Sequence, residues 1–374
     1  MTDNPGILLT LFAFLVVIGL LVFVHEMGHY LVGRWCGVKA ETFAIGFGKE
    51  IAGWTDKRGT RWKICMLPLG GYVQFAGDMD PSGTKSSDWL SLPAEERNQT
   101  FQSKSLWKRA AIVFAGPAIN FIFAILIIMG FVIAYGTSAT LPVVSEVSPN
   151  STAAAIGMEP GDRVISVNGE KIELFEDLRQ KIMLIPEQNV EIVYERDGQR
   201  IAKQGKTGVQ ILKDRFGNEY RLGLLGMSSS KVEWREVTPL EAPAVAVEKT
   251  IGIVDQITTT LGQVITGKRS IKELGGPLKI AQVSGEQFKL GLESFILFVA
   301  LISINLGFIN LLPIPMLDGG HLMFYAIEAV RRKPASAKVQ EWAFRSGLAL
   351  VMVFMVVVTF NDLSSFGLFR SISG

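Results

Sequence analysis

The chain has few cysteines and charged residues, and it lacks any long run of positive charge. Two cysteines, Cys36 and Cys65, are too few for a disulfide framework and are not spaced as a metal-binding motif. The net charge is only +2, so a nucleic-acid-binding surface has no compositional support. We therefore exclude a disulfide-rich fold and predict no nucleic-acid partner.

Apolar residues are abundant and make up 48% of the 374 residues. Because a helix needs about 20 mostly apolar residues to cross a bilayer, four segments qualify: residues 7–32, 106–135, 295–312 and 344–360. No small-residue cleavage site precedes His25, so we expect the first segment to be a retained membrane helix. The predicted fold class is a polytopic α-helical membrane protein with about four transmembrane helices, whose first partner is the lipid bilayer.

Lysine and arginine are distributed asymmetrically around these helices. Residues 33–105 carry ten of them, and the connection between the last two helices carries Arg331, Arg332, Lys333 and Lys338. The positive-inside rule places both loops in the cytoplasm, which leaves both termini and the region between the second and third helices outside. Glycine-punctuated, β-prone runs in residues 33–105 predict β-hairpins close to the membrane.

The outer region has two parts, which gives predicted domains at residues 1–140, 141–230, 231–292 and 293–374. Residues 141–230 contain short alternating runs, turn signals at Asn168-Gly169 and Asp197-Gly198, and one helical stretch at 175–184, which indicates a small strand-rich domain. Residues 239–267 have a helical period instead. That helix either lies along the membrane surface or packs on the strand-rich domain.

The most specific local pattern is His-Glu-x-x-His within the first apolar segment. On a helix, His25 and His29 share one face, so both imidazoles can bind one metal ion while Glu26 lies beside its open position. Zinc is the expected metal, because it binds histidine and because hydrolysis needs no redox-active ion. A carboxylate beside zinc can accept the proton of an attacking water. We predict a Zn²⁺-dependent hydrolase site with Glu26 as the catalytic acid and base.

A second polar cluster interrupts the third apolar segment, in the run Asn310 to His321 with two prolines and a glycine pair. Such breaks at membrane depth are tolerated only within protein or around a polar cavity. Asp318 can supply the third zinc ligand, because a catalytic zinc usually takes three protein ligands. Asn310 either donates to a substrate carbonyl or makes a helix–helix hydrogen bond. His321 is left out of the metal set.

Three motifs in this order resemble the site-2 protease family of intramembrane zinc metalloproteases: the His-Glu-x-x-His helix, FAGPAIN at residues 114–120 and NLLPIPMLDGG at 310–320. The likeness spans essentially the whole chain, and it is greatest to the bacterial branch that carries a PDZ domain and cleaves anti-sigma factors. It implies that His25, His29 and Asp318 are the zinc ligands, that Glu26 is catalytic and that Asn310 contacts substrate.

The resemblance also implies a location and a class of partner. The protein would be a multi-pass protein of the bacterial inner membrane, with its active site toward the cytoplasm and its termini in the periplasm. Its substrates would be single-pass membrane proteins, such as an anti-sigma factor or remnant signal peptides. A membrane-associated β element would pair with the unwound substrate, or would be only a structural hairpin; its residues here are Gly70, Gly71, Tyr72 and Val73.

The periplasmic segment resembles a PDZ domain at residues 147–149 and 157–169. The sequence departs from the best-known members of the branch, because only one such domain fits between the helices.

Two other functions are weighed against the intramembrane protease. A zincin that faces water would use a downstream acidic ligand, for which Glu50 is the candidate, but the motif here lies inside an apolar run. A non-catalytic PDZ scaffold would leave Glu26, Asp318 and both histidines without a purpose.

Overall fold

The computed structural model describes residues 6–77, 90–213, 219–267, 269–270 and 275–365. The chain forms two compact units, Met1–Ile128 with Gly276–Thr359, and Met129–Gly275 with Phe360–Gly374. Residues 78–89 of the predicted cytoplasmic loop, and residues 268 and 271–274 of the predicted outer helical segment, lie outside the described residues.

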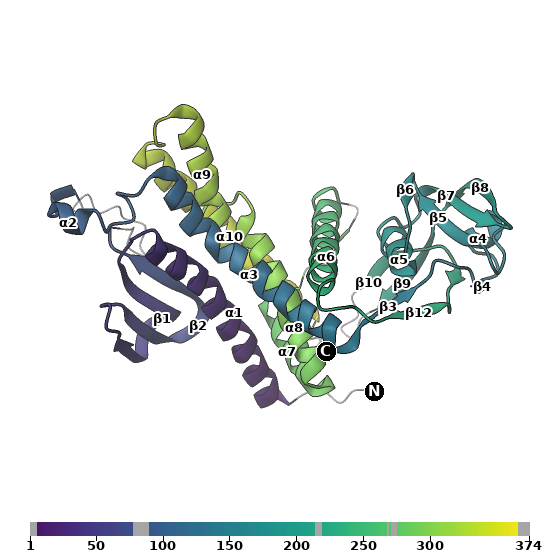
Figure 1. Ribbon diagram of the computed structural model, residues 1–374, viewed down its shortest axis with the longest axis horizontal. Helices are drawn as coiled ribbons and strands as arrows, with labels where there is room; N and C mark the ends of the chain where they lie inside the picture. Colours follow the sequence, from purple (N-terminus) through teal and green to yellow (C-terminus); the bar gives the residue numbers. More distant parts are fainter. Residues whose placement is uncertain (1–5, 78–89, 214–218, 268, 271–274, 366–374) are drawn as a thin grey trace, which may run out of the picture. The chain divides into compact units, whose positions relative to one another are not determined.

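Four helices of the described residues are long and apolar enough to cross a membrane (Figure 1). They are α1 (Ile7–Trp35), α3 (Leu106–Tyr135), α8 (Leu292–Leu311) and α10 (Ala337–Ser365). Each contains most or all of a segment that the sequence predicted to span the bilayer. Many of their large apolar side chains are exposed; Leu8 is 85% exposed and Val356 is 64% exposed. Such surfaces are unfavourable in water and suit contact with lipid.

In the first unit, α1 packs through a stripe of fully buried residues, Ala13, Val17 and Leu21, which form one apolar cluster with Phe295 and Val299 of α8. The four-residue spacing of the stripe keeps it on one helix face. A further helix, α7 (Pro277–Leu290), also packs on α1, where a Cβ on Gly285 would approach the side chain of Thr10 to 2.6 Å. The predicted outer segment 231–292 therefore includes a helix that belongs to the membrane-helix unit.

The predicted β-rich loop forms two long, bent strands, β1 (Ala40–Thr55) and β2 (Arg61–Phe75), followed by a short helix, α2 (Ala94–Arg97). Ala44 of β1 pairs with both Tyr72 and Lys63 of β2, and Lys63 pairs also with Gly53. The order across the sheet is therefore the end of β2, the start of β1, the start of β2 and the end of β1. Figure 1 shows this hairpin against one side of α1.

The polar break after α8 leads into a helix that the sequence analysis did not predict, α9 (Asp318–Arg331). It is joined to α3 by an ion pair, in which Arg109 Nη2 lies 2.7 Å from Glu328 Oε1. The guanidinium of Arg109 also lies over the ring of Tyr325, 5.1 Å from its centroid. These contacts fix the far end of α9 against the start of α3.

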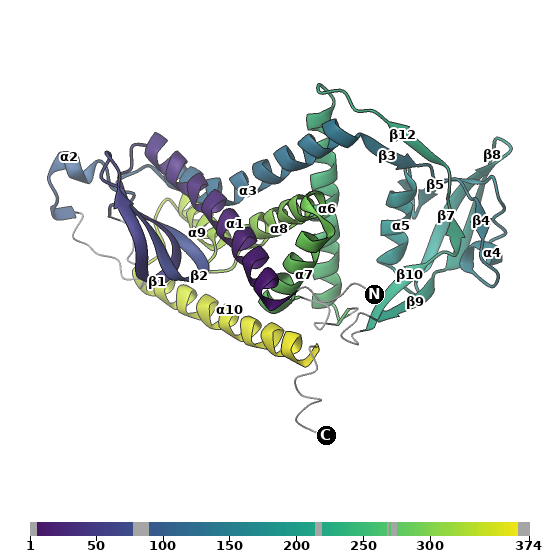
Figure 2. The ribbon, with the colours of Figure 1, turned by 90° about the horizontal axis from the view of Figure 1, so that it is seen from below.

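The second unit is rich in strands, as predicted, and its main sheet has the order β6-β5-β7-β8. Its core is formed by apolar residues of this sheet and of α5, including Val164, Ile192 and Leu178. Figure 2 shows α5 beside β5 of this sheet. The predicted turns are confirmed by left-handed backbone angles at Asn168-Gly169 and Asp197-Gly198, as hairpin turns require. Its elements are β3 (Thr137–Thr140), β4 (Glu146–Val147), α4 (Thr152–Ala155), β5 (Arg163–Val167), β6 (Glu170–Lys171), α5 (Phe175–Met183), β7 (Asn189–Arg196), β8 (Gln199–Lys206), β9 (Gly208–Lys213), β10 (Glu219–Leu224), β11 (Met227–Ser228) and β12 (Val232–Arg235).

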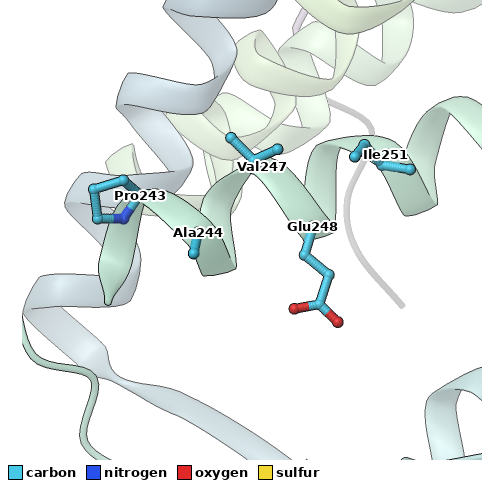
Figure 3. Close-up of a pocket in the computed structure, with 5 residues that line it drawn as sticks. All are labelled: Pro243, Ala244, Val247, Glu248 and Ile251. Carbon is cyan, nitrogen blue, oxygen red and sulfur yellow. The ribbon is translucent and has the colours of Figure 1, made fainter. Parts of the chain in front are cut away.

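The predicted helix at residues 239–267 is confirmed as α6 (Ala242–Ile265). Gln263 near its end donates a hydrogen bond to the carbonyl of Leu184, which joins α6 to the strand-rich part of the same unit. That contact favours the packed alternative at this end of the helix. The opposite end presents an open apolar pocket along one side, lined by Pro243, Ala244, Val247, Glu248 and Ile251 (Figure 3).

A buried ion pair holds the loop before β5, and it gives the second unit a predicted pH dependence. Asp162 is 1% exposed and accepts hydrogen bonds from Arg196 Nε and Nη2 and from the Glu159 amide, all at 2.8 Å. Burial alone would raise the pKa of Asp162, but the hydrogen bonds from Arg196 and Glu159 lower it below its usual value. The carboxylate therefore stabilises the folded unit at neutral pH.

Asp162→Asn is expected to destabilise the second unit by about 2 kcal/mol at pH 7, because hydrogen bonds to a charged partner are lost. In the wild type this contribution is complete above the unfolded pKa of about 3.9 and disappears as pH falls through the lower folded pKa. Hydrogen exchange of β5 and β7 in the full-length protein measures both effects, with Asp197→Asn in an exposed turn as the control. Equal protection of the Asp162 variant and the wild type at pH 7 would contradict the assignment.

Candidate metal centre

His25 and His29 project from one face of α1 and meet Asp318 at the start of α9. His25 Nε2 lies 3.3 Å from His29 Nε2 and 3.2 Å from Asp318 Oδ2, and His29 Nε2 lies 3.6 Å from Asp318 Oδ1. These three residues are the one group of possible metal ligands found in the described part of the chain. The structure therefore brings together the three ligands predicted from residues almost three hundred positions apart.

The spacing and chemistry of these atoms fit zinc. Zinc binds histidine nitrogen and carboxylate oxygen at about 2.0–2.2 Å, so neighbouring ligands of a tetrahedral site lie about 3.4 Å apart. The observed separations of 3.2, 3.3 and 3.6 Å bracket this value. Asp318 Oδ2 is also buried, and it makes no hydrogen bond of normal geometry among the described residues. A buried carboxylate oxygen in this position is stabilised by a cation.

Asp318 is held in place by the sharp turn between α8 and α9. A Cβ on Gly319 would lie 2.2 Å from the carbonyl oxygen of Leu312, and one on Gly320 would lie 2.4 Å from that of Ile314. The glycine pair is therefore needed for the chain to fold back at this point. Because Asp318 is the first residue of α9, its carboxylate also lies at the positive end of the helix dipole.

The backbone of α3 packs directly against the ring of His29. The carbonyl oxygen of Ile112 lies 2.9 Å from His29 Nδ1, so it accepts the proton there and leaves Nε2 free to bind a metal ion. Gly116, one turn further along, has no side chain because a Cβ would lie 2.2 Å from His29 Nε2. Gly28 allows the same close approach, since a Cβ on it would lie 2.4 Å from the carbonyl oxygen of Ala115.

Asn120 was missed as a site residue by the sequence analysis, although it ends the FAGPAIN motif. It is fully buried, and its side-chain amide lies 3.0 Å from His25 Nδ1. The available signal was its spacing: Asn120 lies four residues after Gly116, on the same face of α3. Nothing in the local sequence, however, shows that this face meets the histidines.

Glu26 is 9% exposed and lies between the metal-ligand cluster and the end of β2. It interacts electrostatically with His25, His29 and Asp318, and the backbone amide of Val73 is hydrogen-bonded to it. Gly71 gives it room, since a Cβ there would approach Glu26 Cγ to 3.2 Å. Glu26 can therefore act on a water molecule beside the three ligands.

The other predicted site residues lie nearby in the same unit. Asn310 is half-buried in the last turn of α8, just before the break that leads to Asp318. Gly70, Gly71, Tyr72 and Val73 lie in the last part of β2, which pairs with β1 along one edge, and Gly70 has a positive φ of 123°. The structure thus brings the predicted substrate-binding strand to Glu26.

Two rejected candidates lie outside the ligand cluster. Glu50 forms an ion pair with Arg61 within the β1–β2 hairpin, and it is not among the residues that could hold a metal ion. His321 places its ring 4.8 Å from that of Phe344 on α10. The geometry thus favours Asp318 over Glu50 as the third ligand and agrees with the exclusion of His321.

Comparison with known proteins gives the same class. The sequence profile of Peptidase family M50 matches residues 13–354. A protein of Agrobacterium fabrum named "Putative zinc metalloprotease Atu1380" is 45% identical, with 94% of this chain and 95% of that protein covered. A protein of Mesorhizobium japonicum named "Putative zinc metalloprotease mll0638" is 43% identical, with 95% of this chain and 98% of that protein covered. "Metalloprotease MmpA" of Caulobacter vibrioides is 34% identical, over 99% of each chain.

Among solved structures, the PDZ domain of an SdrC-like protein from Listeria monocytogenes matches 24% of this chain and 85% of that one, with 17% identity and a TM-score of 0.19.

Four apolar helices, with a histidine–carboxylate centre formed by the first of them and α9, define a multi-pass membrane metalloprotease. The chain belongs to Peptidase family M50, the site-2 protease family, and is a zinc metalloprotease.

Proposed function

We propose that this protease cleaves peptide bonds within or next to the membrane-spanning segments of other membrane proteins. The observation that carries the proposal is the position of Glu26, nine residues before the end of an apolar helix that ends at Trp35. At 1.5 Å per residue, Glu26 lies about 14 Å along the helix from that end. An active site at this depth suits a substrate that is itself in the bilayer.

In the proposed mechanism, His25, His29 and Asp318 hold zinc, which when bound would polarise the attacking water and the scissile carbonyl. Glu26 accepts a proton from that water and passes a proton to the leaving amine nitrogen. Asn310, half-buried beside the break after α8, donates its amide N–H to the substrate carbonyl oxygen as negative charge develops there.

The end of β2 is the proposed binding edge for substrate. A protease needs an extended backbone, and addition to a sheet edge replaces the hydrogen bonds that a substrate helix loses when it unwinds. Residues 71–75 have β1 as their strand neighbour on one side and contact Glu26 through Gly71 and Val73. The hairpin also exposes the large apolar residues expected of a membrane-associated element: Phe47, Ile51, Trp54, Ile64, Met66 and Leu67.

Substrates of this class include anti-sigma factors and signal peptides left in the membrane, since both present a single apolar span. We further propose that residues 141–230 form a periplasmic PDZ domain. The support is their likeness to PDZ sequences at residues 157–169 together with a four-stranded sheet packed on a helix.

Cleavage of single-span substrates in liposomes tests the function. We expect mass spectrometry to place the cut inside or at the edge of the apolar span. A substrate whose span contains Asn, Gly or Pro should be cut faster than one with an unbroken Leu span, because its helix unwinds more readily. Cuts confined to water-exposed domains, at equal rates for both spans, would reject cleavage within the membrane.

The orientation of the protein is a separate prediction. Exposed tryptophans mark one end of three membrane helices, namely Trp35, Trp107 and Trp342, which are 80%, 76% and 72% exposed. Tryptophan is enriched at membrane–water interfaces, and the adjoining loops carry the excess of Lys and Arg, so this end is proposed to be cytoplasmic.

Single cysteines on α2 and β8 test the orientation, in a variant without Cys36 and Cys65. Glu95→Cys is expected to react with an impermeant maleimide only after the inner membrane is opened, whereas Gln199→Cys reacts in spheroplasts. Both residues are exposed in the structure. Labelling of both positions from the same side would contradict the proposed topology.

A further inference from the structure

The two histidines have different hydrogen-bond partners at Nδ1. Each histidine directs Nε2 toward the cluster with Asp318 and Nδ1 toward α3. For His29 the partner of Nδ1 is a backbone carbonyl oxygen, which can only accept a hydrogen bond. For His25 it is the carboxamide of Asn120, which has both a donor and an acceptor. Asn120 can therefore set the position of the proton on His25.

Metal binding decides which amide atom must face the ring. A histidine nitrogen that binds a metal ion carries no proton, so a neutral His25 bound through Nε2 keeps its proton on Nδ1. The amide nitrogen of Asn120, 3.0 Å from Nδ1, would then face the Nδ1–H of His25, and two donors cannot form a hydrogen bond with each other. A half-turn about the Cβ–Cγ bond exchanges the amide nitrogen with the oxygen, which has no hydrogen-bond partner among the described residues.

We propose that Asn120 is a positioning residue of the metal centre, whose carboxamide oxygen accepts the Nδ1–H of His25 and so presents the Nε2 lone pair to zinc. The inference rests on the proposed role of His25 as a ligand. With this assignment, the Nδ1–H of each histidine donates a hydrogen bond to an oxygen atom of α3. Partners of this kind fix the ring orientation and raise the basicity of the ligand.

The structure holds Asn120 firmly enough for this role. Its backbone carbonyl oxygen accepts a hydrogen bond of 2.8 Å from Ser303 Oγ on α8, and both residues are fully buried. Gly116, one turn earlier on α3, lets the histidines approach the helix backbone. Asn120 therefore lies where α1, α3 and α8 meet, and its side chain is directed at one ligand.

A pair of substitutions of similar size separates positioning from packing. Asn120→Asp keeps an oxygen acceptor for Nδ1–H, whereas Asn120→Leu fills the space without one. If Asn120 only packs, the buried charge of the Asp variant should be the more harmful change. If it positions His25, the Asp variant should bind zinc nearly as tightly as the wild type, and the Leu variant about 10–100-fold more weakly.

Zinc affinity of the purified full-length proteins is measured by competition with a chelator, and the visible absorption spectrum after Co²⁺ substitution reports the ligand geometry. Ser284→Ala, which removes another buried helix hydroxyl, on α7, is the control for helix packing and should keep the wild-type spectrum. Zinc binding by Asn120→Leu as tight as, or tighter than, that of Asn120→Asp would overturn the proposal. If His25→Ala binds zinc as tightly as the wild type, the ligand assignment fails and the proposal fails with it.

Discussion

Glu26→Gln is expected to slow cleavage by about two to four orders of magnitude while leaving the bound zinc unchanged. The glutamine amide has nearly the same shape as the carboxylate but cannot take a proton from water. The three ligand side chains do not include Glu26, so their geometry should survive the change. The measurement is the rate of cutting a single-span substrate, together with the zinc content of the purified protein.

Glu50→Gln is the matched control, because it makes the same chemical change in the β1–β2 hairpin. That variant should keep both zinc and most of the activity. A Glu26→Gln enzyme with turnover within tenfold of the wild type would show that another group moves the proton. Loss of zinc from the same variant would instead make Glu26 a ligand.

Asp318→Asn should lower zinc occupancy and activity together. An amide oxygen is a neutral and weaker ligand, and the variant removes the one anionic member of the ligand set. We expect zinc affinity to fall by more than the roughly 10–100-fold that loss of a hydrogen-bonding neighbour costs. Equilibrium dialysis against buffered zinc measures this directly.

The outcome for Asp318 also decides between two sources of the third ligand. A water-facing zincin would take that ligand from Glu50, which here forms an ion pair with Arg61. If Glu50→Gln released zinc while Asp318→Asn retained it, an active site built from the membrane helices would be wrong.

Much of this architecture could be predicted because its signals are local. Unbroken apolar runs predict membrane helices, and the four-residue spacing of His25 and His29 places them on one face of α1. Asp318 could be predicted because it is the only acidic residue between Glu293 and Glu328, so a carboxylate in that apolar setting needed a partner. The Asn-Gly and Asp-Gly turns of the second unit were predictable for the same reason, since each depends on two adjacent residues.

The missed features depend on contacts between distant residues. Asn120 lies 95 positions from His25, and the carbonyl of Ile112 lies 83 positions from His29. Neither contact produces a periodic pattern in the sequence. A backbone carbonyl is present at every residue, so its contact cannot be predicted from residue type. The predicted outer segment 231–292 contains both α6 and α7, and contacts between distant residues, such as Gly285 with Thr10 and Phe288 with Phe12, assign α7 to the membrane-helix unit.

The order of the ligands along the chain has a consequence for biosynthesis. His25 and His29 enter the membrane with the first helix, whereas Asp318 leaves the ribosome almost three hundred residues later. At about 5–20 residues per second, that interval is roughly 15 to 60 s. During this time the nascent chain has two histidines in the bilayer but no complete set of ligands. A protease built in this way stays inactive until the ribosome has passed Asp318, so it cannot cut other chains while its first helices are being made.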